Sequence, residues 1–126
     1  MQRILVSLII GLLLLSVAGC GGGGDQNGEV TQQQQVAAGQ SVYTAECAEC
    51  HDPGGIGPVL DASNLAAYGT AQELYTYVHG AMPLDAPGSL TDQQYYDVTA
   101  YMISDAGLLP QDVVIGPDTL GTVNLR

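Results

Sequence analysis

The sequence predicts an all-α fold, and the pattern of helix signals carries this prediction. Residues 70–73 and 91–94 both match the capping box, in which a Thr and a Glu or Gln three residues later close the start of a helix. The residues Val36, Gly39, Tyr43 and Cys47 recur at three- and four-residue spacing, which is typical of one helix face. The length of 126 residues fits one domain.

The start of the chain, residues 1–19, has the pattern of an export signal. A short positive segment with Arg3 precedes an apolar run over residues 4–15, and small residues follow up to Cys20. The alternative is a retained membrane helix, but the run is short of the ~20 apolar residues that span a bilayer. We therefore expect residues 1–19 to be removed on export.

The four residues that end at Cys20 resemble the lipobox of bacterial lipoproteins. The resemblance implies cleavage before Cys20 and acyl chains on its sulfur and new amino group, which anchor a protein firmly. The alternative is an ordinary thiol, although no fourth cysteine exists to pair with it. Residues 20–35, glycine-rich and polar, are expected to form a flexible, lipid-anchored linker. These features place the protein in a bacterial cell envelope, facing the periplasm or the cell exterior.

The folded part of the chain is expected over residues 36–106, with a tail over residues 107–126. A core of about 70 residues is marginal and usually needs a disulfide, a metal or another bound group. The chain has no Trp, no Phe and 3 cysteines, too few for a disulfide scaffold. A buried apolar group would supply the missing core. The apolar residues of the tail predict that it wraps the domain or meets a partner, with disorder as the alternative.

The charge of the chain is strongly acidic, with 13 Asp and Glu against 2 Lys and Arg. Loss of Arg3 with the signal would move the formal net charge from −11 to −12. Nucleic acid is excluded as a partner, because phosphate neutralisation needs Lys and Arg. The charge favours solubility and selects basic partners. A merely solvated acidic surface is the alternative.

The segment from Cys47 to His51 reads C-x-x-C-H, the attachment pattern of a c-type haem. On a helix, Cys47, Cys50 and His51 stand at i, i+3 and i+4, which is one face. Two thiols there reach the two vinyl groups of a porphyrin, and the imidazole stands over the iron. A zinc site completed by His79 is weaker, because adjacent Cys and His rarely bind one tetrahedral ion. A redox dithiol would need a βαβ setting. We predict one haem c.

Met82 lies in a Gly/Pro loop and is the candidate for the sixth iron ligand. Methionine with histidine is the electron-transfer ligation that raises the haem potential. The loop has no apolar period, so core packing explains Met82 poorly. The rival ligand is His79, although a histidine at the end of the helix that starts at Thr70 can simply complement the helix C-terminus. We expect His51 and Met82 to be the axial ligands of the iron.

Two helices are expected to frame this site. The first runs over about residues 35–49, with Gly39 on its buried stripe, which predicts close packing against another element. The last runs from Thr91 to near residue 105, and its stripe includes Tyr95 and Val98. Its start also has a plausible hydrophobic staple.

Together these residues resemble the class I cytochrome c family over about residues 36–105. Gly39 and Tyr43 match the glycine and the aromatic residue of the family's first helix. Val98 and Tyr101 match their partners on the last helix, where the two helices cross. The resemblance implies a small helical domain wrapped around one covalently attached haem.

The loop over residues 57–60 resembles the one whose proline carbonyl accepts a hydrogen bond from the proximal histidine. On that analogy Pro58 orients His51, the support that a metal-bound imidazole needs. The segment at Met82 matches the family's distal ligand segment. The family's mitochondrial members are rich in lysine around the haem edge, whereas this chain has none, which puts their docking mode in doubt.

These observations predict a single-electron carrier outside the cytoplasmic membrane, and not an enzyme. Its partners would be a donor and an acceptor redox protein with basic docking patches, and a membrane through the lipid anchor. One alternative is a fixed cytochrome subunit of a larger oxidoreductase. The other is a haem-based ligand-binding or peroxidase-type protein with an open sixth site.

Overall fold

The computed structural model describes residues 28–126, so the expected export signal, Cys20 and the first half of the expected linker lie outside the described residues. Within residues 28–126 the named elements are all helices, which confirms the predicted all-α fold. A single antiparallel bridge joins Thr70 to Asn124. In chain order the elements are α1 (Gln32–Glu46), α2 (Ala48–His51), α3 (Ala62–Ala66), α4 (Ala71–Ala81), α5 (Asp92–Asp105) and the 3-10 helix η1 (Leu120–Thr122).

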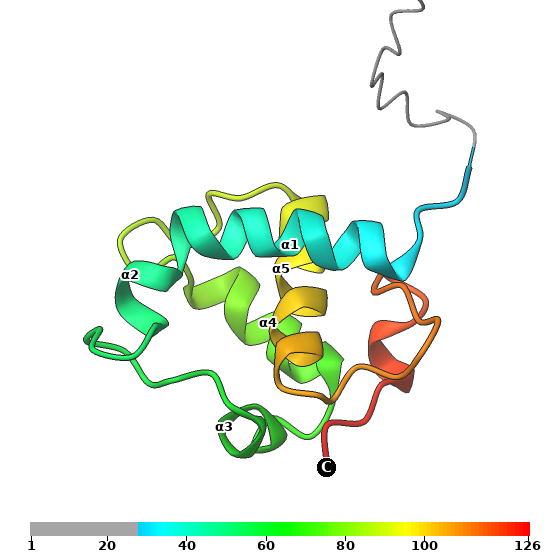
Figure 1. Ribbon diagram of the computed structural model, residues 1–126. Helices are drawn as coiled ribbons and strands as arrows, with labels where there is room; N and C mark the ends of the chain where they lie inside the picture. Colours follow the sequence, from blue (N-terminus) through cyan, green and yellow to red (C-terminus); the bar gives the residue numbers. More distant parts are fainter. Residues whose placement is uncertain (1–27) are drawn as a thin grey trace, which may run out of the picture.

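The centre of the fold is the crossing of α1 over α5 (Figure 1). A Cβ atom at Gly39 would overlap the carbonyl of Asp97 and lie 2.8 Å from the Cβ of Tyr101, so only glycine allows this approach. Beside it, the rings of Tyr43 and Tyr101 lie 5.1 Å apart, centroid to centroid. The predicted close packing at Gly39 is therefore confirmed.

Capping boxes begin both later long helices, as predicted. At α4 the hydroxyl of Thr70 accepts from the N–H of Glu73, and the Glu73 carboxylate accepts from the N–H of Thr70 at 3.1 Å. At α5 the side chains of Thr91 and Gln94 make the same exchange. These local bonds satisfy the free N–H groups at each helix start.

The start of α1 differs from the prediction. The expected linker over residues 20–35 is wrong for its last residues, because α1 begins at Gln32 behind a third capping box of Thr31 and Gln34. Gln35 is buried, with 1% of its surface exposed. The run of glutamines suggests a solvated tether, but the capping box turns it into the first turn of a helix. The other end also differs: α1 ends at Glu46, and α2 is a separate turn.

The tail over residues 107–126 wraps the helices, one of the two outcomes that its apolar residues predict. Figure 1 shows it in orange and red beside the start of α1, at the opposite end of the molecule from α2. Main-chain bonds fasten its end to the start of α4: the N–H of Leu125 donates to Gly69, and the N–H of Ala71 donates to Val123, both at 2.9 Å. The tail adds four buried side chains to the core: Ile115, Leu120, Val123 and Leu125.

Candidate haem site

The C-x-x-C-H motif forms a single helical turn that follows α1. The N–H groups of Cys50 and His51 both donate to the carbonyl of Cys47, at 3.1 and 3.0 Å. This turn places the two thiols and the imidazole on one side, as the spacing predicts. Both cysteines are free thiols and half-buried. Burial first, and then the charges of Glu46 and Cys50, raise the pKa of the Cys47 thiol to about 11.

The imidazole of His51 is oriented by the loop that follows it. Its Nδ1 lies 2.8 Å from the carbonyl oxygen of Pro58, which can only accept, so Nδ1 carries the proton. That tautomer leaves Nε2 free to bind a metal. The loop is closed by a bond of 2.8 Å from the N–H of Gly57 to the carbonyl of Cys50. A Cβ on Gly57 would lie only 3.1 Å from the His51 ring, so the loop folds tightly over the imidazole.

Met82 is presented by a different segment, at the C-cap of α4. Its N–H donates to the carbonyl of Val78 at 2.9 Å, which continues the helical ladder by one residue. Its own carbonyl accepts a bond of 2.8 Å from the phenol of Tyr95 on α5. The residue is half-buried against the core. The structure therefore holds the backbone of Met82 from both α4 and α5.

His79, the rival ligand, already has partners. Its ring centroid lies 4.6 Å from that of Tyr95 and 5.6 Å from that of Tyr75. Its Nε2 lies 3.4 Å from a carboxylate oxygen of Asp92. The imidazole thus sits in the seam between α4 and α5, in the last turn of α4, where a histidine complements the helix dipole. This arrangement favours Met82 over His79 as the sixth ligand.

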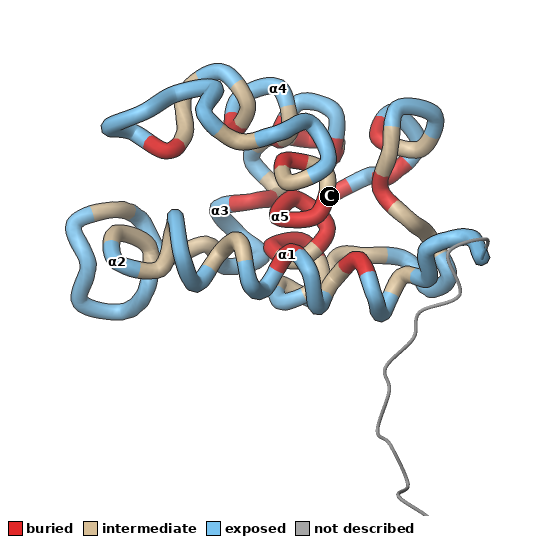
Figure 2. The backbone as a smooth tube through the Cα atoms, turned by 90° about the horizontal axis from the view of Figure 1, so that it is seen from above, coloured by how far each residue is buried: buried red, intermediate tan, exposed pale blue. Residues whose placement is uncertain are grey.

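The residues around the motif fit a haem. Imidazole and thioether donors are an established axial pair for haem iron. Within residues 28–126 five large apolar side chains are exposed. Val30, at 54%, precedes α1, and the other four follow the motif in the chain: Ile56 at 92%, Leu84 at 74%, Tyr77 at 47% and Val59 at 46%. An apolar porphyrin could cover side chains of this kind, whereas their exposure to water is unfavourable in free energy. Figure 2 shows the contrast: α5 is largely buried, while α2 and the loop after it contain no buried residue.

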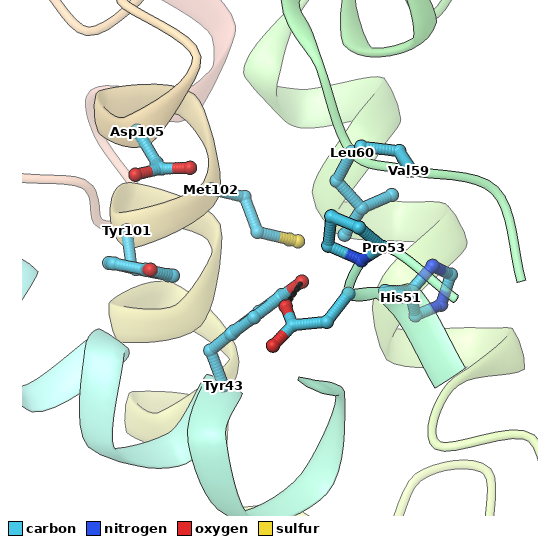
Figure 3. A pocket seen from close by; sticks show the side chains of 9 residues that line it. Tyr43, His51, Pro53, Val59, Leu60, Tyr101, Met102 and Asp105 are labelled. Atoms are coloured by element: carbon cyan, nitrogen blue, oxygen red, sulfur yellow. Dashed lines mark hydrogen bonds between the residues drawn. The ribbon is translucent and has the colours of Figure 1, made fainter. Parts of the chain in front are cut away.

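A cavity of about 200 Å³ lies beside the motif turn, between α1, α5 and the loop after His51. The phenol of Tyr43 donates to the carboxylate of Asp52 at 3.0 Å, and burial first, then this bond, raise the pKa of Tyr43. In Figure 3 the sulfur of Met102 points into the space, and the imidazole of His51 lies at its edge. Motif spacing alone does not predict a role for Asp52, although the residue directly follows the motif. The lining residues are Tyr43, His51, Asp52, Pro53, Val59, Leu60, Tyr101, Met102 and Asp105.

Comparisons with known proteins show the family of this chain. The profile of the family described as cytochrome C oxidase, cbb3-type, subunit III matches residues 34–102. Cytochrome c6 of Synechococcus elongatus is 38% identical over 80 residues, which cover 56% of this chain and 91% of that protein. Cytochrome c6 of Thermosynechococcus vestitus has the same identity over 80 residues, covering 56% of this chain and 70% of that protein. No solved structure gives a significant match.

Proposed function

We propose that this chain, which belongs to the cytochrome c family and matches its cbb3-type subunit III model, is a single-electron carrier. Membership of the family implies a covalently bound haem c, and we propose His51 and Met82 as its axial ligands. The observation that carries the proposal is the bond from His51 Nδ1 to Pro58, which leaves Nε2 free beside two thiols of one helical turn. When bound, the haem supplies a one-electron couple.

The residues of the chain have separate roles in this proposal. Cys47 and Cys50 bind the ring covalently, and Pro58 keeps the imidazole of His51 in one tautomer and one orientation. Met82 supplies a thioether, which raises the potential and fills the sixth position. Because Pro58 holds the His51 ring and Tyr95 holds the Met82 carbonyl, these two side chains would need to move little between the two oxidation states of a bound haem. No side chain is required to move a proton or to attack a substrate.

An absorption spectrum of the purified protein tests haem attachment and ligation together. We expect a low-spin c-type spectrum, a methionine charge-transfer band in the ferric protein, and no ready binding of carbon monoxide by the ferrous protein. Ready carbon monoxide binding would contradict the filled sixth position. It would support the ligand-binding or peroxidase-type alternative instead.

The proposed partners are redox proteins with basic docking patches. Exposed carboxylates lie in and beside the motif turn, at Glu46, Glu49 and Asp52. Within residues 28–126 the one Lys or Arg is Arg126, at the end of the tail beside Gly69, just before α4. Opposite charges accelerate encounter and align the two proteins, and they add less to the final affinity.

We further propose that Cys20 carries a lipid that anchors the protein on the outer side of a membrane. The support is the sequence before Cys20. Over residues 28–126, no helix has the length and apolar character to cross a bilayer. Cys20→Ser is expected to move the protein from the membrane fraction to the soluble fraction while haem content stays unchanged. A mutant that still pellets with membranes would contradict lipid anchoring.

A fixed subunit of a larger oxidoreductase is the second candidate, and the description of the matching family favours it. The two candidates differ in how the protein is held. Isolation of the native chain in mild detergent distinguishes them. A mobile carrier is expected to purify alone, whereas a subunit would purify in a constant ratio with other chains.

A further inference from the structure

Tyr95 occupies an unusual place for a polar side chain. It is fully buried, at 0% exposure, four residues after the N-cap of α5. Its hydroxyl donates to the carbonyl of Met82 at 2.8 Å. A phenylalanine would fill the same core volume and serve equally well in the helix pattern. The hydroxyl is therefore the part of this residue that core packing does not require.

We propose that Tyr95 is a positioning residue that holds Met82 in place as the sixth iron ligand. The inference rests on the proposed function, because it assumes the ligand role of Met82. Met82 lies just past the end of α4, where carbonyl groups lose their helical partners. The Tyr95 hydroxyl satisfies this carbonyl from the neighbouring helix. The Tyr95 side of the bond is buried and Met82 is only partly exposed, so little water competes for the carbonyl, and the bond limits how far the methionine can move.

The ring of Tyr95 is itself held in place, which gives its hydroxyl a fixed direction. Tyr75 meets it edge-on at 6.5 Å and 83°, and the imidazole of His79 lies at 4.6 Å. His79 is in turn drawn toward Asp92, with 3.4 Å between Nε2 and the carboxylate oxygen. The same contacts therefore fix the Tyr95 ring and occupy the imidazole that would otherwise compete for the iron.

The variant Tyr95→Phe tests the proposal on the haem-loaded protein. External imidazole competes with Met82 for ferric iron, so its affinity reports how firmly the methionine is held. We expect imidazole to bind about tenfold more tightly to the variant, the worth of one buried hydrogen bond. The reduction potential is expected to fall, and the methionine charge-transfer band to weaken. Tyr96→Phe removes a hydroxyl from the next residue, whose ring stacks on Tyr75 at 4.8 Å, and is the matched control.

Equal imidazole affinity and equal potential in Tyr95→Phe and the wild type would overturn the inference while leaving Met82 as the ligand. A wild-type ferric protein without the methionine band would overturn the ligand assignment and this inference together. A second measurement needs no variant. In NMR spectra of the ferrous wild type, the hydroxyl proton of Tyr95 should exchange slowly with water. Rapid exchange would contradict the buried bond to Met82.

Discussion

The two ends of α1 lie in very different surroundings. At its start, the tail packs over the helix with buried side chains such as Ile115, and the side-chain amides of Gln32 and Gln35 form hydrogen bonds with main-chain groups of the tail. At its end, the motif turn and the loop after it have no buried residue, and Ile56 is 92% exposed. The core at the tail end is filled by the protein's own side chains. The motif end has its ligands and its apolar side chains arranged for a group that the chain must acquire.

The largest expected effect comes from removing both attachment thiols. In Cys47→Ala with Cys50→Ala, we expect complete loss of covalent haem and a large loss of helicity, since a small core without its bound group is marginal. Haem staining on a denaturing gel and circular dichroism measure the two effects. Cys20→Ser is the control and should keep its haem. Haem that stays attached through denaturation of the double mutant would disprove the attachment site.

Met82→Ala is expected to open the sixth position without releasing the haem. The ferrous variant should bind carbon monoxide readily, and the potential should fall by at least ~60 mV, a tenfold change for one electron. Met82→Leu is the matched control, because leucine keeps the volume of methionine and removes only the thioether. A Met82→Leu variant that keeps the wild-type potential and does not bind carbon monoxide would assign the effect of Met82→Ala to packing and not to ligation.

At the tail end, Gln35→Leu should lower stability and leave the haem spectrum unchanged. The Gln35 amide donates to the carbonyl of Ile115 and accepts from its N–H, both at 2.7 Å. The substitution leaves two buried backbone groups unpaired, at a cost of about 2–4 kcal/mol in the free energy of unfolding. Gln33→Leu, at an exposed site of the same helix, should change it by no more than about 0.5 kcal/mol. Denaturant titration of both variants compares them, and equal effects would contradict the buried role of Gln35.

The smallest expected effect concerns the charges at the two ends. Glu46→Gln with Glu49→Gln should slow electron transfer with a basic partner severalfold at low salt, and the difference should shrink as salt rises. The Debye length falls from ~30 Å at 0.01 M to ~8 Å at physiological ionic strength. Asp112→Asn with Asp118→Asn removes two exposed charges at the tail end and should have less effect. Stopped-flow rates that do not change with ionic strength would indicate that the acidic surface favours solubility and does not guide a partner.

The parts of the fold that could be predicted are those set by near neighbours in the chain. The capping box at Thr70 can be predicted because all its bonds lie within four residues. The box at Thr31 has the same local bonds, but its residues belong to a glutamine run that resembles a linker. Gln35 shows why: its partner, Ile115, is 80 residues away. A polar side chain looks solvated in sequence until its distant partner is known.

The same distinction applies to the site. Spacing alone places Cys47, Cys50 and His51 on one helical turn, because a helix brings i, i+3 and i+4 together in any protein. The resemblance of residues 57–60 to the family's loop also predicts the hydrogen bond between His51 and the carbonyl of Pro58. The hydroxyl of Tyr95 on the carbonyl of Met82, by contrast, depends on how α5 packs against the end of α4. No periodicity in the chain encodes that contact, because it arises only when two separate helices share one core.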